Sequence, residues 1–150
     1  MDILTLAAIG VFAAAAVVDG RSRRIPNPLS LGLALIGLVR IAAGLAAGAG
    51  FGAAALDLAA AAAVFLAGAV AFRFRLLGGG DVKLIAAAAL WLGAAALGPF
   101  LLATAVAGGA LAIGFLLTRN LRREGLAAGL PYGIAIAVGG ILVSAGAAWA

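Results

Sequence analysis

The feature that most constrains this chain is a stretch without any charged residue, from Leu84 to Leu117. As one α-helix its 34 residues would be about 51 Å long, whereas the hydrocarbon core of a bilayer is about 30 Å thick. The stretch must therefore fold back on itself. Gly98-Pro99 is the predicted break, because proline cannot continue a helix and biases the residue before it away from helical geometry.

The rest of the chain is equally apolar. Of 150 residues, 67% are hydrophobic and only 10% are charged, against about 25% charged in soluble domains. These values exclude the soluble globular, disordered and disulfide-stapled classes. We predict an all-α, polytopic integral membrane protein, a single domain over residues 1–150, with six transmembrane helices at about 3–19, 28–49, 53–72, 82–98, 99–117 and 130–149.

The basic residues predict how these spans are oriented. They fall after the first, third and fifth spans, as Arg21, Arg23, Arg24, Arg73, Arg75, Lys83, Arg119, Arg122 and Arg123. With six spans all three loops lie on one side, and the positive-inside rule makes that side cytoplasmic and both termini extracytoplasmic. The net charge of +5 then reflects topology and does not indicate nucleic-acid binding.

The inventory of reactive side chains narrows the chemistry. The chain has no cysteine and no histidine, so thiol nucleophiles, imidazole bases and the usual zinc sites are excluded. Carboxylates or Lys83 must act if the protein is an enzyme. Asp19 ends the first predicted span and Asp81 begins the fourth, so the crossing pattern brings both to one membrane level.

Two interpretations of these aspartates are open at this point. Asp19-Gly20 is a common turn pair, and Asp81 could simply cap its helix. A helix N-terminus stabilises a carboxylate at Asp81, whereas a C-terminus disfavours one at Asp19. Together the two carboxyls predict one ionised base, Asp81, and one protonated acid, Asp19, which aspartic proteolysis requires.

Two segments resemble a known family. Gly78-Gly79-Gly80-Asp81-Val82-Lys83-Leu84 resembles the Gly-x-Gly-Asp signature of intramembrane aspartic proteases, in the form typical of type IV prepilin peptidases. The segment from Asp19 to Ile25-Pro26-Asn27 is similar to that family's first catalytic segment. The resemblance implies that Asp19 and Asp81 are the catalytic pair. It also implies supporting or substrate-binding roles for Gly78, Gly80, Lys83, Pro26, Asn27, Pro131 and Tyr132.

The supporting residues also have plainer interpretations. Lys83 suits a membrane-edge anchor, and Asn27 suits a cap for a helix whose first residue is Pro28. Pro131 and Tyr132 suit the start of a helix with an interfacial tyrosine. The glycines before Asp81 would allow a substrate backbone to approach closely.

The chain departs from the long members of that family. It has no cysteine, and so lacks their Cys-x-x-Cys insert, which is associated with N-methylation. It resembles the short form that serves Flp, or tight-adherence, pili. The resemblance implies an enzyme of the inner membrane that removes the basic leader of prepilins and pseudopilins at the cytoplasmic face, with membrane lipid around it and with no cofactor, metal or methyl transfer.

Other functions stay open from the residues alone. An archaeal preflagellin peptidase shares the same core. A CDP-alcohol phosphotransferase is faintly echoed by Asp19-Gly20-Arg21, and a Ser-Lys protease would combine Lys83 with Ser22 or Ser30. A scaffold or transporter subunit would use the aspartates only as caps or cation ligands.

Arg40 and Asp57 match none of the motifs. Both fall inside predicted spans, at depths that differ by about 6 Å, and each is costly there alone. We expect them to form an interhelical ion pair with a structural role.

Overall fold

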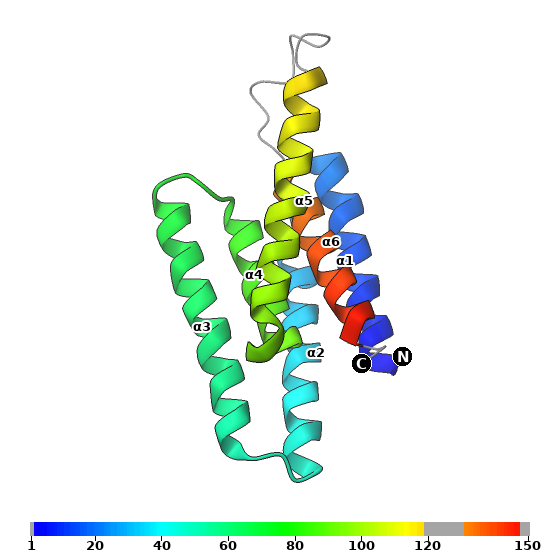
Figure 1. Ribbon diagram of the computed structural model, residues 1–150, viewed down its shortest axis with the longest axis vertical. Coiled ribbons are helices and arrows are strands. Elements are labelled where there is room, and N and C mark those ends of the chain that lie inside the picture. The colour runs from blue at the N-terminus through cyan, green and yellow to red at the C-terminus, as the bar shows by residue number, and fades with distance from the viewer. Residues whose placement is uncertain (1, 119–130, 148–150) are drawn as a thin grey trace.

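The computed structural model describes residues 2–118 and 131–147. Within these residues the chain forms six α-helices and one 3₁₀ turn, with no strand (Figure 1). The elements are α1 (Ile3–Ser22), α2 (Asn27–Ala46), α3 (Phe51–Arg73), α4 (Gly79–Leu92), η1 (Ala94–Ala96), α5 (Leu97–Thr118) and α6 (Tyr132–Ala147). The predicted all-α class is confirmed.

Four segments are long and apolar enough to cross a membrane: α1, α2, α3 and the continuous stretch Ala94–Leu117, which contains all of α5 but its last residue. The helices α4 and α6 are apolar but shorter, at 14 and 16 residues. Large apolar side chains cover much of the outside of the bundle, among them Phe51, Leu66 and Leu117. Lipid is the solvent that suits such a surface.

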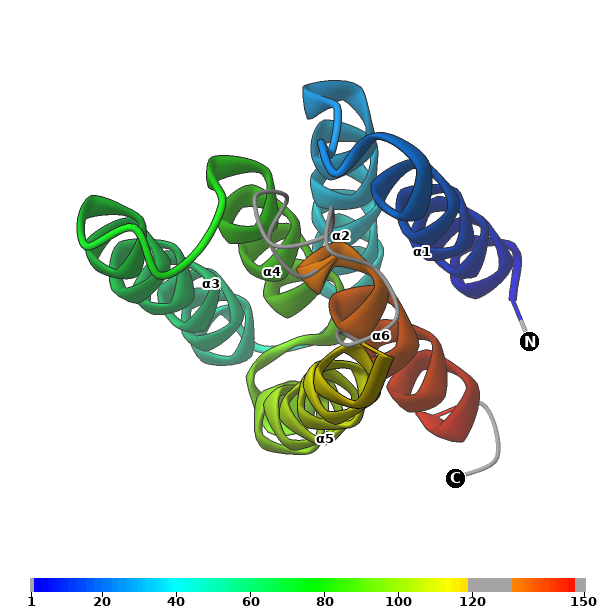
Figure 2. The ribbon, with the colours of Figure 1, turned by 90° about the horizontal axis from the view of Figure 1, so that it is seen from above.

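The helices are arranged around α6 and α4. Seen from above, α6 lies among α1, α4 and α5, while α4 lies between α2 and α3 (Figure 2). Helix α3 is peripheral: it packs mainly on α4 and has no buried residue. The start of α1 and the end of α6 lie at the same end of the bundle (Figure 1).

The core is small and depends on close helix approach. Its largest fully buried side chains are Phe12, Phe100, Leu33, Leu84 and Ile136. A Cβ at Gly37 would lie 2.9 Å from backbone atoms of α4, so this glycine allows α2 to approach α4 nearly to backbone contact. Small residues at helix contacts are how membrane helices gain dispersion energy without a hydrophobic driving force between them.

The fold-back in the uncharged stretch comes earlier than predicted. It lies at Gly93, which has a φ of +81°, and α5 has already begun at Leu97. Gly98 and Pro99 therefore occupy the first turn of α5, where proline is tolerated because its missing N–H would have no helical acceptor. The prediction of a break at Gly98-Pro99 was wrong.

The ends of the other helices differ from the prediction by a few residues. Helix α1 continues to Ser22, beyond the predicted end at residue 19, and so places Asp19 in its last turn. At its other end Asp2 accepts the Thr5 N–H at 2.7 Å, and hydrogen bonds from the side chain and the backbone of Thr5 lower the pKa of Asp2 from its usual value. The predicted basic cluster at Arg119, Arg122 and Arg123 lies outside the described residues, as do both predicted limits of the sixth span.

Candidate active site

Asp19 is a buried carboxyl in the last turn of α1. Only 4% of the residue is exposed, and its backbone carbonyl accepts the N–H of Arg23, which ends the helix in the left-handed region. Its Oδ2 atom is buried and has no hydrogen-bond partner among the described residues. A buried polar atom left in this state is costly.

The N-terminus of α6 faces this carboxyl. The backbone N–H groups of Gly133 and Ile134 are directed at Asp19. A Cβ on Gly133 would lie 2.8 Å from both Cγ and Oδ2 of Asp19, so only glycine leaves room for the carboxyl. The positive end of α6 therefore offsets the unfavourable C-terminus of α1, a compensation that the sequence argument did not include.

Asp81 lies in the first turn of α4 and is partly buried. Its Oδ2 accepts the backbone N–H of Gly78 at 3.2 Å, which satisfies one of the free donors at the start of the helix. A Cβ on Gly78 would lie 2.8 Å from that same oxygen. The glycine before the helix is thus part of how the Asp81 carboxyl is seated.

Ile25 joins the two aspartate-bearing regions. Its Cδ1 atom would be 2.8 Å from a Cβ added to Gly133, the glycine that also faces Asp19. Its Cβ and carbonyl oxygen lie 3.1 and 3.2 Å from where a Cβ on Gly80 would stand, next to Asp81. Packed on both, Ile25 holds the loop after α1 against the start of α4, and the two carboxyls are near enough for the charge of Asp19 to act on Asp81.

The predicted supporting residues lie around this pair in different ways. Lys83 Nζ donates to Asn27 Oδ1 at 2.9 Å and so ties the first turn of α4 to the start of α2. The prediction that Asn27 caps α2 was wrong: Pro26 stands at the cap position, and no side chain caps this helix. The Lys83–Asn27 bond also shows that the ammonium group of Lys83 is engaged with an amide and not with a serine.

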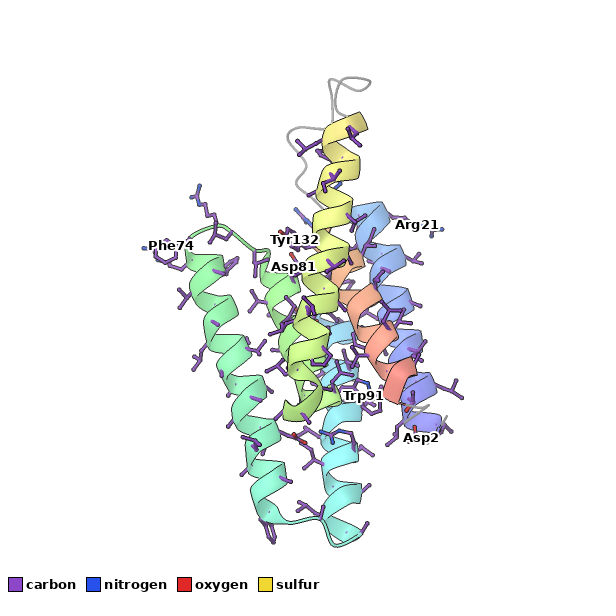
Figure 3. All side chains as sticks on the ribbon, viewed as in Figure 1. Asp2, Arg21, Phe74, Asp81, Trp91 and Tyr132 are labelled. Carbon is purple, nitrogen blue, oxygen red and sulfur yellow. The ribbon has the colours of Figure 1, made fainter. Side chains whose placement is uncertain are left out.

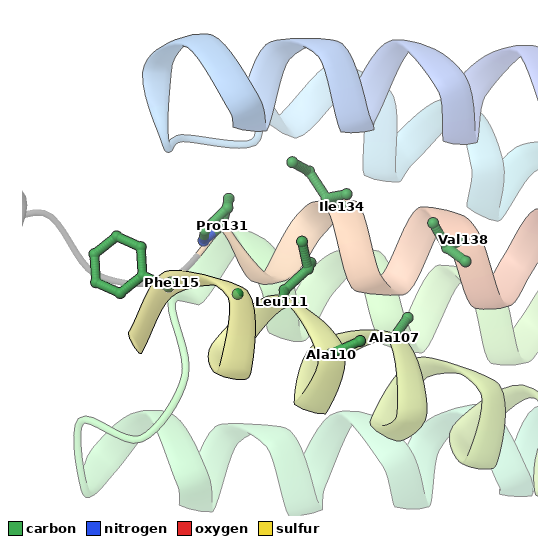
Figure 4. Close-up of a pocket in the computed structure, with 8 residues that line it drawn as sticks. Ala107, Ala110, Leu111, Phe115, Pro131, Ile134 and Val138 are labelled. Carbon is green, nitrogen blue, oxygen red and sulfur yellow. The ribbon is translucent and has the colours of Figure 1, made fainter. Parts of the chain in front are cut away.

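Tyr132 begins α6, and Pro131, which the prediction placed in the helix, directly precedes it and is not part of it. The carbonyl oxygen of Pro131 accepts the Ile134 N–H at 3.2 Å, and Tyr132 is 40% exposed. Figure 3 shows Asp81 and Tyr132 at the same end of the bundle. Pro131 and Ile134 also line an apolar groove of about 680 Å³ between α5 and α6, together with Ala107, Ala110, Leu111, Gly114, Phe115 and Val138 (Figure 4).

Arg40 and Asp57 form the predicted ion pair, at the opposite end of α4. Arg40 Nη2 lies 2.6 Å from Asp57 Oδ2 and also donates to the carbonyl of Leu90 at 3.3 Å. Asp57 Oδ1 accepts the Ala94 N–H at 2.8 Å. The pair therefore satisfies backbone groups on both sides of the Gly93 turn.

Two residues that touch the site were not singled out by the sequence argument. The predicted catalytic and supporting residues did not include Ile25 or Gly133, although each directly neighbours a residue that was predicted, Pro26 and Tyr132. The position of Gly133, two residues after Pro131 at a helix start, could have indicated it, because the free N–H groups there attract a carboxylate. In the part of the chain that the structure describes, no three acidic side chains cluster as metal ligands.

The fold and the site together define a class: a multi-helix membrane protein that holds two carboxyls, from separate helices, at one end of the bundle. A comparison with known protein families gives the particular family. The sequence profile of the type IV leader peptidase family matches residues 6–113, which include both aspartates. The chain belongs to this family, and its membership supports a protease. No curated protein and no solved structure matches the chain.

Proposed function

We propose that this protein is an aspartic endopeptidase of the inner membrane that removes the basic leader peptide from type IV prepilins and pseudopilins of the Flp type. Asp19 and Asp81 are its catalytic pair. The bundle end that holds them faces the cytoplasm, both termini face the opposite side, and six helices cross the membrane. The basic residues Arg21, Arg24 and Arg73, all exposed near that end, support this orientation.

The observation that carries the proposal is the state of Asp19. Its carboxyl is buried, one of its oxygens has no partner among the described residues, and a helix N-terminus points at it. A merely structural carboxylate would have its oxygens satisfied, as both oxygens of Asp57 are by neighbouring donors. The free oxygen is instead suited to donate or accept a proton when a substrate enters.

Hydrolysis needs one ionised and one protonated carboxyl. Asp81, stabilised by the Gly78 N–H, takes a proton from water, and the resulting hydroxide adds to the scissile carbonyl carbon while Asp19 donates its proton to the carbonyl oxygen. The tetrahedral intermediate then collapses: the C–N bond breaks, the amine takes the proton from Asp81, and a hydroxyl proton returns to Asp19. One water is consumed and both aspartates regain their starting states.

The other site residues shape the substrate path. Gly78 and Gly80 keep the approach to Asp81 free of side chains, Pro26 sets the start of α2 beside Ile25, and Pro131 and Tyr132 present the N-terminus of α6 to Asp19. The groove between α5 and α6 begins next to this point and is almost wholly apolar. It suits the apolar segment that follows the leader in a prepilin.

Cleavage is proposed to occur without methyl transfer, and no cofactor takes part in the proposed steps. The chain contains no cysteine and so cannot form the paired Cys-x-x-Cys motifs associated with methylation. The mass of the mature pilin tests this point directly. An N-terminus heavier by one methyl group would contradict it.

The test of the proposed function is cleavage of a co-expressed Flp-type prepilin, followed by gel mobility. We expect Asp19→Asn and Asp81→Asn each to reduce cleavage at least about a thousandfold at equal membrane abundance, since general acid–base groups contribute up to about 10⁴-fold. Asp57→Asn is the matched control, because it removes a carboxylate from the same bundle at the other end of α4. It is expected to leave cleavage intact.

The same experiment separates the proposal from its alternatives. If cleavage survives Asp19→Asn or Asp81→Asn, the two aspartates act only as helix caps, and a scaffold or transporter subunit is favoured. Cleavage of a preflagellin in preference to a prepilin would assign the chain to the archaeal preflagellin-type peptidases, which share this core.

A further inference from the structure

A second groove lies on the outside of the bundle, where α2 and α3 diverge over α4. The view from above shows α4 between these two helices, which touch each other only weakly (Figure 2). The groove has a volume of about 420 Å³ and is lined by Leu31 and Ala34 of α2, Ala61 and Phe65 of α3, and Ala87 and Leu90 of α4. Apart from its upper end, its walls are small or apolar side chains.

The end of the groove nearest Asp81 is polar and positively charged. Lys83 and Asn27 line it there, and the Lys83 ammonium uses one of its three N–H groups on the Asn27 amide oxygen. Both residues are exposed, so the remaining donors face outward. Below them lies Ser30, which is 5% exposed and whose Oγ has no hydrogen-bond partner among the described residues. A buried hydroxyl in this state, on the wall of a groove, indicates a missing polar partner.

We infer that this groove binds one anionic phospholipid. The phosphate lies on Lys83 Nζ and the Asn27 amide, the ester oxygens of the lipid accept a hydrogen bond from Ser30 Oγ, and one acyl chain runs down the alanine-lined wall toward Leu90. The volume is within the range of about 300–1,000 Å³ for small-molecule sites, and a polar head above an apolar tail matches a lipid in its natural orientation.

Charge favours a lipid over the substrate. The leader that the proposed enzyme removes is basic, and Lys83 repels it. A phosphate is attracted by the same group, and anionic lipids are most abundant in the leaflet that faces the cytoplasm.

The experiment measures lipid binding directly, so that its outcome does not depend on peptidase activity. The full chain is purified in detergent, and bound phosphatidylglycerol, phosphatidylcholine and inorganic phosphate are compared by native mass spectrometry. We expect phosphatidylglycerol to bind at least about fivefold more tightly than phosphatidylcholine, since one lysine near a membrane surface contributes about 1 kcal/mol. Inorganic phosphate alone should not displace it.

Two pairs of variants locate the binding. Lys83→Ala should lose the preference for phosphatidylglycerol, whereas Arg73→Ala, which removes a positive charge at the exposed end of α3, should keep it. Ala61→Trp should block the groove from α3, a helix with no buried residue, so the fold should tolerate it. Ala63→Trp is the control, because residue 63 is exposed and lies about 200° around the helix from residue 61.

Five results would overturn the inference. Equal binding of the two lipids, or an equal loss in Lys83→Ala and Arg73→Ala, would mean diffuse attraction to basic loops. Unchanged phosphatidylglycerol binding by Ala61→Trp would place the lipid elsewhere. Displacement by inorganic phosphate would leave only a free-anion site, and displacement by a prepilin peptide would assign the groove to the substrate.

Discussion

The carboxylates near the two ends of α4 have opposite surroundings. Near the C-terminus of α4, Asp57 of α3 lies 2.6 Å from Arg40 and accepts the Ala94 N–H at 2.8 Å, so its charge is neutralised and both of its oxygens have partners. At the N-terminus of α4, Asp81 has one backbone donor, and the nearby Asp19 keeps an oxygen without a partner among the described residues. The first end is built to hold helices together, and the second leaves polar atoms available to a substrate.

The comparison gives a criterion that separates structural from functional carboxylates in a membrane protein. A lone carboxylate is costly anywhere in the bundle, so its location within an apolar span does not decide its role. What decides it is whether the fold supplies all the partners. By that criterion Asp57 is structural, and the oxygen of Asp19 without a partner among the described residues supports the functional role proposed for Asp19 with Asp81.

The largest effect that we expect on this comparison comes from Gly133→Ala. The added Cβ would stand 2.8 Å from Cγ and Oδ2 of Asp19 and would displace the carboxyl. A displacement of about 1 Å at a catalytic group costs about a hundredfold in rate, so prepilin cleavage should fall by about that factor. The rate is to be measured on purified protein with a synthetic prepilin.

The control for Gly133→Ala lies on the same helix. A Cβ at Gly146 would meet nothing within 4 Å, so Gly146→Ala should keep full activity. If both variants cleaved at the wild-type rate, the carboxyl of Asp19 would not need its place at the N-terminus of α6, and the contrast between the two ends of α4 would weaken.

The sequence predicted the helical class, the ion pair between Arg40 and Asp57, and the location of both catalytic candidates in their helices. These follow from local signals: long apolar runs, charges that are costly alone, and a glycine-rich segment before an acid. The sequence did not predict the break at Gly93. That turn depends on Asp57, which is far away in the chain and accepts the Ala94 N–H, so no local pattern around Gly98-Pro99 could reveal it.

The surroundings of the site were missed for the same reason. Asn27 has the chemistry of a helix cap, yet its oxygen is used by Lys83 from another helix. Asp19 was expected to meet only the C-terminus of its own helix, whereas α6 brings N–H groups to it. Side-chain type and spacing predict which groups matter, but partners from other helices decide how each is satisfied.

An intermediate effect, on stability and not on catalysis, is expected at the other end of α4. Arg40→Ala leaves Asp57 without its cation in a partly buried place, since the two side chains are 34% and 17% exposed. We expect it to lower the free energy of unfolding by about 2 kcal/mol, less than the 3–5 kcal/mol of a fully buried pair. Cleavage per folded molecule should not change.

A double-mutant cycle shows whether the pair acts as a unit. Arg40→Ala, Asp57→Ala and the double variant should give a coupling energy of about 1–2 kcal/mol, measured by reversible unfolding in mixed micelles. Additive losses would mean that each residue stabilises the Gly93 turn separately, through Leu90 and Ala94, and that the direct ion pair contributes nothing.

The smallest effect concerns the buried hydrogen bond between Trp91 and Ser144, which lies near the Gly93 end of α4. Trp91 Nε1 donates to Ser144 Oγ at 3.0 Å, and both residues are nearly fully buried. Trp91→Phe keeps an aromatic ring but leaves the serine hydroxyl without its donor, which should cost about 1–2 kcal/mol of unfolding free energy. Ser144→Ala should cost a similar amount because it orphans the indole N–H instead. The bond connects α4, which carries Asp81, to α6, whose N–H groups face Asp19. The cleavage rate per folded molecule is therefore the second measurement. A fall in that rate would show that the Gly93 end of α4 also sets the geometry at the proposed catalytic end.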